Sequence, residues 1–319
     1  MAKGTFRSKK FSFIRTLFSF VIIFCIIYAI GYLLSFFSKS SLQSFIPDSL
    51  LSTEVAGKSI RDLQTTITGG TKKASTVSDA SESKVLKLKI AILADSHADD
   101  ENLKKALDKA KSMDVSTVFF LGDYTRVGAK SELEAAKKVM DASSLPYYSI
   151  PGDHDIAQGS TANFTEVFGD RYQSLSVKGV TFILLDNSDD NGENAMGVDT
   201  IQMAWFKKEL SNLQTDAPAI LLTANPLYGK SGFRLMGDGS SALKAESDEL
   251  LALIRKSEIK VVVAGDSHLS SRSQDPEKKG LEHIVVGALL TGDTNLQTPR
   301  FDVMEIYDDG SYSIEEVIL

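Results

Sequence analysis

Aspartate and histidine residues follow four apolar segments of the sequence, each at the point where a predicted strand ends. These residues are Asp95, His97, Asp123, Asp153, His154, Asp155, Asp266 and His268. Carboxylate oxygens and imidazole nitrogens together bind hard to borderline divalent metals. Carboxyl ends of strands in an open α/β sheet meet at one edge, so we expect these side chains to converge there. The pattern predicts a metal site distributed over several loops.

A simpler explanation exists for each cluster taken alone. Gly-Asp is ordinary turn chemistry and occurs six times in this chain. The alternative for His154 is a structural turn histidine. However, three of the four histidines of the chain lie in these strand-end clusters. This concentration favours the metal site over a set of unrelated turns.

The elements that position these residues alternate between strand and helix. Helices are predicted from Asp99 or Asp100 onward, near 130–142, over 200–212 and over 241–256, from apolar residues at i, i+3, i+4 and i+7. Strands are predicted at 85–94, 116–121, 147–150, 173–177, 180–186, 218–222, 259–264, 283–287, 301–306 and 312–317. This order indicates an α/β domain over residues 85–319.

The order and spacing of these motifs resemble the calcineurin-like metallophosphoesterases. The pattern in that family is D-x-H, G-D, G-N-H-[DE], a lone His and G-H-x-H. This chain has Asp95-x-His97, Gly122-Asp123, Gly152-Asp153-His154-Asp155 and Gly265-Asp266-x-His268. The resemblance covers about residues 87–317 and implies a four-layer α/β/β/α sandwich with two bridged metals at the strand ends.

The resemblance implies that Asp95, His97, Asp123 and His268 hold the first metal. The second metal would share Asp123, but its other positions depart from the family: Asp153, Asn225 and Asp266 stand where the family has Asn, His and His. Either this site has been re-specified for another metal or it has been lost. All three replacements are competent oxygen ligands, which favours re-specification.

Ligand chemistry predicts a different metal at each site. The first mixes nitrogen with oxygen and should take Mn, Fe or Zn, whereas the all-oxygen second site should take Mn, Mg or Ca. Two such ions would hold a bridging hydroxide for in-line attack on a phosphoester. His154, oriented by Asp155, would then protonate the leaving group. Arg126 and Arg234 could steady a phosphate or be solvated surface charges.

The N-terminal part of the chain predicts a membrane anchor. Residues 16–37 contain no charge, and 22 helical residues span roughly 33 Å, enough to cross a bilayer core. Five basic residues lie within residues 1–15, so we expect a cytoplasmic N-terminus and an exported domain. A cleaved signal peptide is the alternative, although the apolar run is long and lacks a clear small-residue cleavage pattern.

Composition limits the remaining function classes. Residues 38–84 are predicted to be a flexible linker, because Ser, Thr, Gly and Lys dominate 65–84. The net charge of −7 argues against a basic nucleic-acid-binding surface, and a single cysteine excludes a disulfide framework. Two classes remain: a monomeric, single-pass phosphoesterase with an extracytoplasmic domain, or a weak or inactive metal-stabilised domain that binds a ligand or partner at the same cleft.

Overall fold

The computed structural model describes residues 84–319, apart from 158–159, 189–196, 215–216, 237–240 and 293. The predicted cytoplasmic segment and membrane span, 1–15 and 16–37, lie outside these residues, as does all but the last residue of the predicted linker. Within the described ranges, no helix is both long and apolar enough to cross a bilayer. The anchor therefore stays a prediction.

Two mixed β-sheets form the centre of the domain. The first contains β1 (Leu86–Leu93), β2 (Thr117–Leu121), β3 (Tyr147–Ile150), β10 (Arg300–Tyr307) and β11 (Tyr312–Ile318). Its strand order is β11-β10-β1-β2-β3. The strands β1, β2 and β3 run parallel, and the C-terminal hairpin β10–β11 adds antiparallel strands beside β1. The carboxyl ends of β1, β2 and β3 consequently lie at one edge.

The second sheet is also mixed, with parallel central strands, and is built from strands later in the chain. It contains β4 (Gln173–Val177), β5 (Val180–Leu185), β6 (Ala219–Thr223), β7 (Ile259–Ala264), β8 (Ser271–Gln274) and β9 (Glu282–Val285). Its order is β4-β5-β6-β7-β9-β8, with β5, β6, β7 and β9 parallel and an antiparallel strand at each edge.

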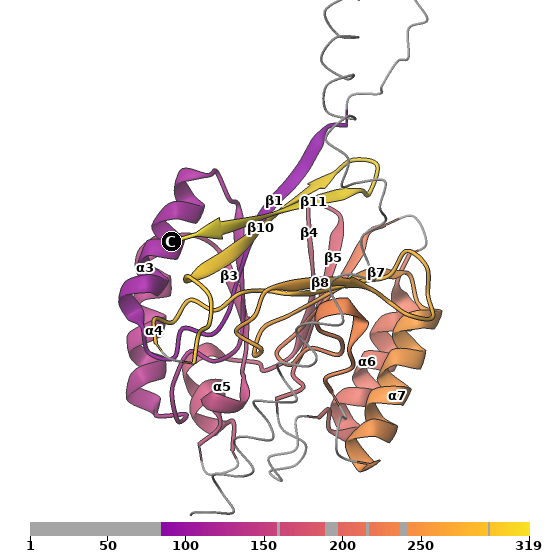
Figure 1. Cartoon of the computed structure of the whole chain (residues 1–319), viewed down its shortest axis with the longest axis horizontal. Coiled ribbons are helices and arrows are strands. Elements are labelled where there is room, and N and C mark those ends of the chain that lie inside the picture. Colours follow the sequence, from indigo (N-terminus) through magenta and orange to yellow (C-terminus); the bar gives the residue numbers. More distant parts are fainter. Residues whose placement is uncertain (1–83, 158–159, 189–196, 215–216, 237–240, 293) are drawn as a thin grey trace, which may run out of the picture. The chain divides into compact units, whose positions relative to one another are not determined.

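Helices cover the outer face of each sheet, which gives four layers (Figure 1). The helices α3 (Asp100–Ser112), α4 (Lys130–Ser143) and α5 (Ala162–Phe168) pack on the first sheet, and α6 (Thr200–Asn212) and α7 (Ser241–Lys256) pack on the second. A third apolar cluster, which includes Ile92, Phe119, Phe182 and Val263, fills the space between the sheets. The two-sheet α/β fold expected from the sequence is confirmed.

Among the described α-helices and strands, two short elements were not predicted from the sequence. The helix α5 has only seven residues, and Phe164 is its one fully buried side chain. The strand β8 has the polar sequence SRSQ and lies at a sheet edge, where its exposed side chains give no apolar alternation. Both elements depend on tertiary contacts, because neither carries a periodic apolar signal of its own.

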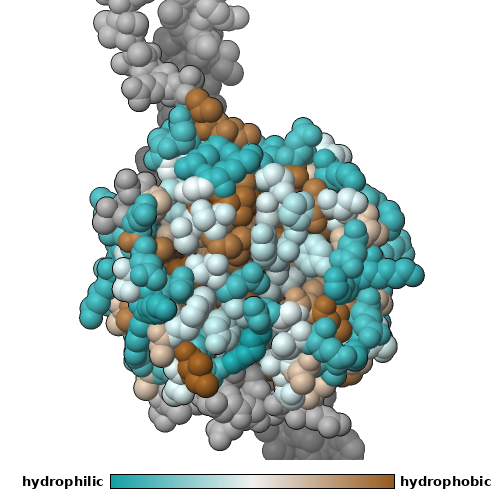
Figure 2. All heavy atoms as spheres, turned by 180° about the vertical axis from the view of Figure 1, so that it is seen from behind, coloured by the Kyte–Doolittle hydropathy of each residue, from teal (hydrophilic) through white to brown (hydrophobic). Residues whose placement is uncertain are grey.

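The surface of the domain is largely hydrophilic. On the face drawn in Figure 2, hydrophobic residues occur in small groups between hydrophilic ones. Exposed large hydrophobic side chains include Val127, Ile201 and Leu296. Singly exposed apolar residues of this kind are normal for a folded domain.

A carboxyl group is buried between the two sheets. Asp302 on β10 is 1% exposed, pairs in register with Ile92 and Glu316, and leaves Oδ1 without a hydrogen-bond partner. Burial raises the pKa of Asp302 to about 7, and Glu316 adds to this, while Arg272 and Arg300 oppose it. The carboxyl is therefore protonated in the folded protein up to neutral pH, whereas it ionises near pH 4 in the unfolded chain.

We expect Asp302→Asn to stabilise the protein at alkaline pH. The parent loses stability as the pH rises from about 4 through 7, because only the unfolded chain then releases the proton. The amide has no proton to lose, so the variant should gain on the order of 3 kcal/mol over the parent at pH 8 and little at pH 4. Denaturant unfolding at both pH values measures the difference, with the exposed Asp108→Asn as control. A variant less stable than the parent at pH 8 would contradict the burial argument.

Candidate metal centre

The predicted site residues of the two sheets meet at one edge of the sandwich. The backbone N–H of Asp95, after β1, donates to the carbonyl of Gly122 at 3.0 Å. Across the sheets, the backbone N–H of Asp266, after β7, donates to Oδ1 of Asp95 at 3.0 Å. The loop after β6 joins the group, since Gly265 N–H donates to the carbonyl of Ala224, the neighbour of Asn225. The structure thus brings together loops that are up to 171 residues apart.

Four of the predicted residues have the spacing of metal ligands. One ligand atom each from Asp95, His97, Asp123 and His268 lies within 4.8 Å of the other three. The Nε2 atoms of the two histidines are 3.0 Å apart. His97 Nε2 is 3.6 Å from Oδ2 of Asp123, and His268 Nε2 is 3.8 Å from Oδ1 of Asp95.

Burial favours the neutral form of both histidines, and a neutral imidazole keeps one nitrogen lone pair for a metal. Burial lowers the pKa of His97 to about 3, with His154 and His268 adding to the shift, and burial also lowers the pKa of His268. His268 Nδ1 lies 3.2 Å from the carbonyl of Thr294, which can only accept, so Nδ1 carries the proton. Its Nε2 is then free as a ligand, which is how a second hydrogen bond prepares histidine for a metal.

A second group shares Asp123 with the first. Ligand atoms of Asp123, Asp153 and His154 also lie within 4.8 Å of one another. Asp266 belongs to neither ligand-spaced group, but burial raises its pKa to about 6, and the charge of Asp153 adds to this. Asn225 is 2% exposed and is held by Asn187, which accepts from its backbone N–H and from Nδ2.

Buried oxygens without partners mark the same place. Oδ2 of Asp95, Oδ1 of Asp153 and Oδ1 of Asn225 are buried and lack a hydrogen-bond partner among the described residues. Burial, followed by the charge of Asp266, raises the pKa of Asp95, and burial and the charge of Asp95 raise that of Asp123. Buried acceptors and converging carboxylates of this kind are costly unless cations neutralise them. The donor set therefore fits divalent metals, and it includes residues of both predicted sites.

Glycines allow the loops to approach this closely. A Cβ on Gly152 would lie 2.1 Å from Oδ1 of Asp123. A Cβ on Gly122 would lie 2.7 Å from the backbone of Gly152, and Gly122 also has a φ of +94°. Any larger residue at either position would push Asp123 away from the other ligands. The Gly-Asp pairs at Gly122 and Gly152 are thus required by packing at the site rather than by turn geometry alone.

Backbone strain is concentrated on the candidate ligands. Ten described residues other than glycine have positive φ angles, and five of them are Asp95, His97, Asp123, Asp266 and His268. Left-handed conformations cost free energy for such residues and persist where the surrounding structure holds them, typically at functional sites. The conformations that direct these side chains toward one another therefore lower the stability of the fold.

Asp155 contacts the backbone around His154 rather than its ring. Its carboxylate accepts from the backbone N–H groups of Gly152, Asp123, Tyr124 and Thr125, at 2.9–3.2 Å. Four such donors oppose the effect of burial, which raises the pKa of Asp155 to about 6. The predicted orientation of His154 by Asp155 thus takes an indirect form, in which Asp155 ties the two loops together.

The ring of His154 is oriented by a backbone carbonyl. Nδ1 of His154 lies 2.8 Å from the carbonyl oxygen of Arg126, so Nδ1 must be the donor. Thr125 Oγ1 donates to the carbonyl of His154, which locks the same loop from the other side. The ring stands edge-on to His97, with centroids 4.5 Å apart. Nε2 is the nitrogen left for a ligand or substrate.

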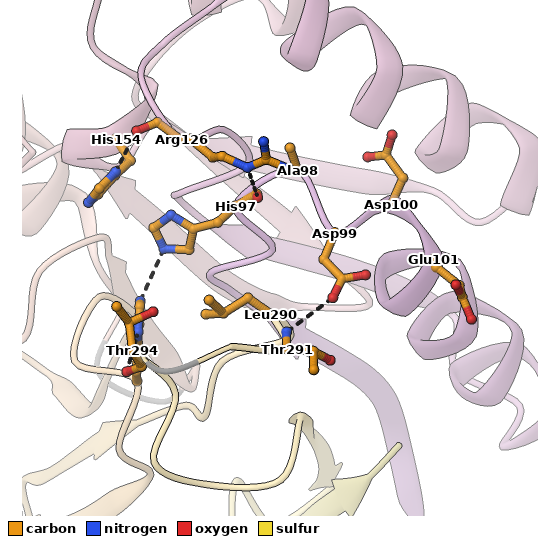
Figure 3. A pocket seen from close by; sticks show the side chains of 11 residues that line it. His97, Ala98, Asp99, Asp100, Glu101, Arg126, His154, Leu290, Thr291 and Thr294 are labelled. Atoms are coloured by element: carbon orange, nitrogen blue, oxygen red, sulfur yellow. Dashed lines mark hydrogen bonds between the residues drawn. The ribbon is translucent and has the colours of Figure 1, made fainter.

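A cleft of about 660 Å³ opens in front of the histidines (Figure 3). Its lining residues are His97, Ala98, Asp99, Asp100, Glu101, Arg126, His154, His268, Leu290, Thr291 and Thr294. Of the two arginines considered from the sequence, Arg126 lines this cleft. Arg234 does not line it and instead donates to Asp248 and Ser247.

One wall of the cleft was missed at the level of sequence. The sequence uses Asp99 and Asp100 only to mark where a helix begins, and Asp99 does cap α3 by accepting from Asn102 N–H at 3.0 Å. The same side chain accepts from the backbone N–H of Thr291, which fixes the loop 290–294 beside α3. Three consecutive acidic residues, one position after Asp95-x-His97, were the available signal, but their place at the cleft depends on this long-range contact.

Comparison with known families gives a match over more than half of the chain. The model described as calcineurin-like phosphoesterase matches residues 88–270. A curated relative, a probable glycerophosphodiester phosphodiesterase GpdQ from Arcobacter nitrofigilis, is 28% identical over 114 residues. That alignment covers 34% of this chain and 41% of the relative, so the chain matches less than half of the relative's length.

Solved structures agree on the fold. A dimetal phosphatase from Danio rerio superimposes with a TM-score of 0.55 and 14% identity, over 72% of this chain and 96% of that one. A purple acid phosphatase from yellow lupin seeds gives a TM-score of 0.51 and 16% identity, over 72% and 53%. At these identities the similarity concerns the fold alone.

Proposed function

Because the chain belongs to the calcineurin-like phosphoesterase family, we propose that it is a metal-dependent phosphoesterase that prefers phosphodiesters. The observation that carries this proposal is the convergence of Asp95, His97, Asp123 and His268 within ligand spacing, next to His154 in an open cleft. A purely structural metal site has no need of an exposed histidine whose Nε2 is free. Retention of His154 therefore favours hydrolysis over a non-catalytic binding domain.

The residues fit two divalent ions, with Asp123 common to both sets. We propose Asp95, His97 and His268 as the remaining ligands of the first ion, and Asp153, Asn225 and Asp266 as those of the second. When bound, such a pair of ions supplies an activated water and neutralises the phosphoryl oxygens. The protein contributes the ligand atoms and the loops with positive φ angles that hold them at the sheet edge.

His154 is the proposed general acid. Attack on phosphorus breaks the bond to the leaving alcohol, whose oxygen needs a proton. With Nδ1 held by the carbonyl of Arg126, His154 would deliver that proton from Nε2. Asp155 serves this step indirectly, because it fixes the loops that carry His154 and Asp123 relative to each other.

The number of carboxylates at the site argues for diesters. Asp95, Asp123, Asp153 and Asp266 carry four negative charges when ionised, which two divalent ions balance without excess. A neutral centre attracts any phosphate anion less strongly than a positively charged centre would. The lost attraction is larger for a dianionic monoester than for a monoanionic diester, because it scales with the charge of the substrate. The relative named as a phosphodiesterase is consistent with this choice.

A matched pair of chromogenic substrates tests the proposal. The full-length chain, purified in detergent and supplied with Mn²⁺, should hydrolyse p-nitrophenyl methyl phosphate faster than p-nitrophenyl phosphate, and EDTA should abolish both rates. No hydrolysis of either substrate by the metal-loaded chain would support the binding-domain alternative. Faster hydrolysis of the monoester would mean that the protein is a phosphomonoesterase. It would also show that the charge of the four carboxylates does not set the substrate preference.

We also propose different metals at the two sites. Two imidazoles at the first site favour Mn, Fe or Zn, whereas the all-oxygen second site favours Mn, Mg or Ca. Asp266→His, which replaces oxygen by nitrogen, should raise zinc affinity at the weaker site by about tenfold or more. Competition with a chelating indicator measures this without any activity assay, and the exposed Asp170→His serves as control. Equal zinc binding by parent and variant would remove Asp266 from the ligand set.

The location of the protein is proposed from its sequence. The uncharged segment 16–37 would anchor a monomeric chain in the cell membrane, with residues 85–319 on the extracytoplasmic side and a phosphoester from solution or from the envelope as substrate. Protease protection in spheroplasts would test this orientation, since an external protease should then release the domain 85–319 while the spheroplast membrane stays intact.

A further inference from the structure

Two asparagines lie next to each other where β5 and β6 end. The two strands run parallel, with Leu185 and Thr223 as their last pair in register. Asn187 follows that pair by two residues after one strand, and Asn225 follows it by two residues after the other. Asn187 is fully buried and Asn225 is 2% exposed. Asn225 is a proposed ligand of the second ion, whereas Asn187 has no role in the function proposed above.

The side chain of Asn187 holds the backbone of Asn225 on both sides. Its Oδ1 accepts from the backbone N–H of Asn225 at 2.8 Å, and its Nδ2 donates to the carbonyl of Asn225 at 2.8 Å. Nδ2 of Asn187 also lies 3.8 Å from Sδ of Met236. The hydroxyl of Thr223 donates to the same carbonyl of Asn225 at 3.1 Å. These bonds fix the backbone from which the side chain of Asn225 projects.

A further contact fixes the orientation of the Asn225 amide. Nδ2 of Asn225 donates to the backbone carbonyl of Asn187 at 2.8 Å. If the amide turned over, its oxygen would face that carbonyl, and two acceptors would oppose each other. Oδ1 therefore lies at the other end of the amide, where it is buried and accepts no hydrogen bond from the described residues. A cation would satisfy such a buried acceptor.

We propose that Asn187 is a positioning residue that holds Asn225 with its amide oxygen toward the second ion. The proposal rests on the metal-dependent function given above, because Asn225 is a ligand only if the second ion binds. The oxygen of an amide attracts a cation, whereas its NH₂ group repels one. An amide that turns freely would offer its oxygen for only part of the time, so the fixed orientation raises the affinity of the second site.

Metal binding by variants tests this role without an activity assay. The full-length chain in detergent is titrated with Mn²⁺ in competition with a chelating indicator. Asn187→Ala should lower the affinity for the second ion by about 10–100-fold, the size of effect expected when a residue that supports a ligand is lost. The ion at the first site should bind as it does in the parent. Equal affinity of Asn187→Ala and the parent for the second ion would overturn the proposal.

Gln202 supplies a matched control in the same part of the domain. It is fully buried and holds the backbone of Asp186 in the same way, because its Oε1 accepts from Asp186 N–H and its Nε2 donates to the carbonyl of Asp186. Asp186 belongs to neither ligand-spaced group. Gln202→Ala should lower the melting temperature in EDTA and leave the Mn²⁺ affinity unchanged. An equal loss of affinity in both variants would assign the effect to a loosened sheet edge and overturn the role of Asn187.

A double-mutant cycle shows whether Asn187 acts through Asn225. Asn225→Ala removes the ligand itself, so adding Asn187→Ala to that variant should cause little further loss of Mn²⁺ affinity. A purely structural role of Asn187 would not depend on the side chain at position 225. Losses of affinity that multiply in the double variant would therefore overturn the proposal.

A second variant decides if Asn187→Ala fails to fold. A carboxylate ordinarily binds Mn²⁺ more tightly than a neutral amide, because it adds a negative charge to the site. In Asn225→Asp, however, the oxygen that replaces Nδ2 would face the carbonyl of Asn187. The variant should therefore bind the second ion no more tightly than the parent. Tighter Mn²⁺ binding by Asn225→Asp would contradict the fixed orientation.

The outcomes also separate this proposal from the proposed function. Unchanged Mn²⁺ affinity in Asn225→Ala would remove Asn225 from the ligand set and overturn the role of Asn187 with it. Hydrolysis of p-nitrophenyl methyl phosphate by the same parent preparation would leave the phosphoesterase standing in that case. A parent chain that binds no second ion would overturn both this proposal and the two-ion centre.

Discussion

Replacing His154 with Gln should reduce turnover of phosphodiesters with alkyl leaving groups by about 10²- to 10⁴-fold. The same change should cost far less for p-nitrophenyl esters, because p-nitrophenolate leaves without needing a proton. The structure supports this role by holding Nδ1 of His154 on the carbonyl of Arg126 and leaving Nε2 at the cleft. Rates on glycerophosphocholine and p-nitrophenyl methyl phosphate, with metal saturating, measure the two effects.

The leaving-group dependence is the decisive part of this result. A loss of the same size on both substrates would mean that His154 binds the phosphoryl group or a metal rather than donating a proton. Because His154 lies within ligand spacing of Asp123 and Asp153, the metal content of the variant must be measured alongside. Unchanged metal content with a selective loss on alkyl esters would support general acid catalysis.

Asp123→Asn should remove metal and, at the same time, stabilise the metal-free protein. Asp123 belongs to both ligand-spaced groups and is 2% exposed. Loss of a residue that only supports a ligand lowers metal affinity or activity by about 10–100-fold. Loss of a ligand shared by two ions should therefore lower metal affinity by at least about 100-fold. Metal content by mass spectrometry should fall by one or two ions per chain.

Stability should change in opposite directions with and without metal. Burial and the neighbouring Asp95 raise the pKa of Asp123, so its ionised form destabilises the metal-free fold at neutral pH. In EDTA at pH 7.5 the variant should melt about 2–4 °C higher for each kcal/mol of repulsion removed, and with metal it should melt lower than the parent. Comparison of melting curves with and without EDTA gives both signs.

Asp186 provides a matched control for this experiment. It is another fully buried aspartate, but Arg171 donates to its Oδ2 at 2.7 Å, and it is not in either ligand-spaced group. Asp186→Asn should therefore lower the melting temperature equally with and without metal. If Asp123→Asn behaves in the same way as this control, Asp123 is a structural residue rather than a shared ligand.

The sequence by itself determined the main elements and the loops that carry the chemistry. Apolar runs and helical spacing placed β1, β2, β3, β7 and the helices α3, α4, α6 and α7 to within a few residues. Polar residues at strand ends identified the side chains that later meet at one edge. These features could be predicted because burial periodicity and turn chemistry are local properties, recorded within a few consecutive residues.

Tertiary structure alone decided how those residues act on one another. Asp155 was predicted to orient His154, but its carboxylate binds four backbone N–H groups, and the ring of His154 rests on the carbonyl of Arg126. Asp99 also joins the start of α3 to the loop 290–294 at the cleft, because it accepts from the backbone N–H of Thr291 across 192 residues of sequence. The carboxyl of Asp302 is confined between two sheets, although its own strand reads as an ordinary apolar segment.

The physical reason for this division is the range of the interactions. Strand and helix patterns are spacings of apolar residues, which can be recognised within one short stretch of the chain. Ligand spacing, pKa values and cleft walls depend on atoms brought together by packing two sheets, such as Asp266 against Asp95 from 171 residues away. Neither local segment specifies that Asp266 will approach Asp95. Residue types at strand ends predicted which atoms could bind a metal. Only the packing of the sandwich decided where each atom lies.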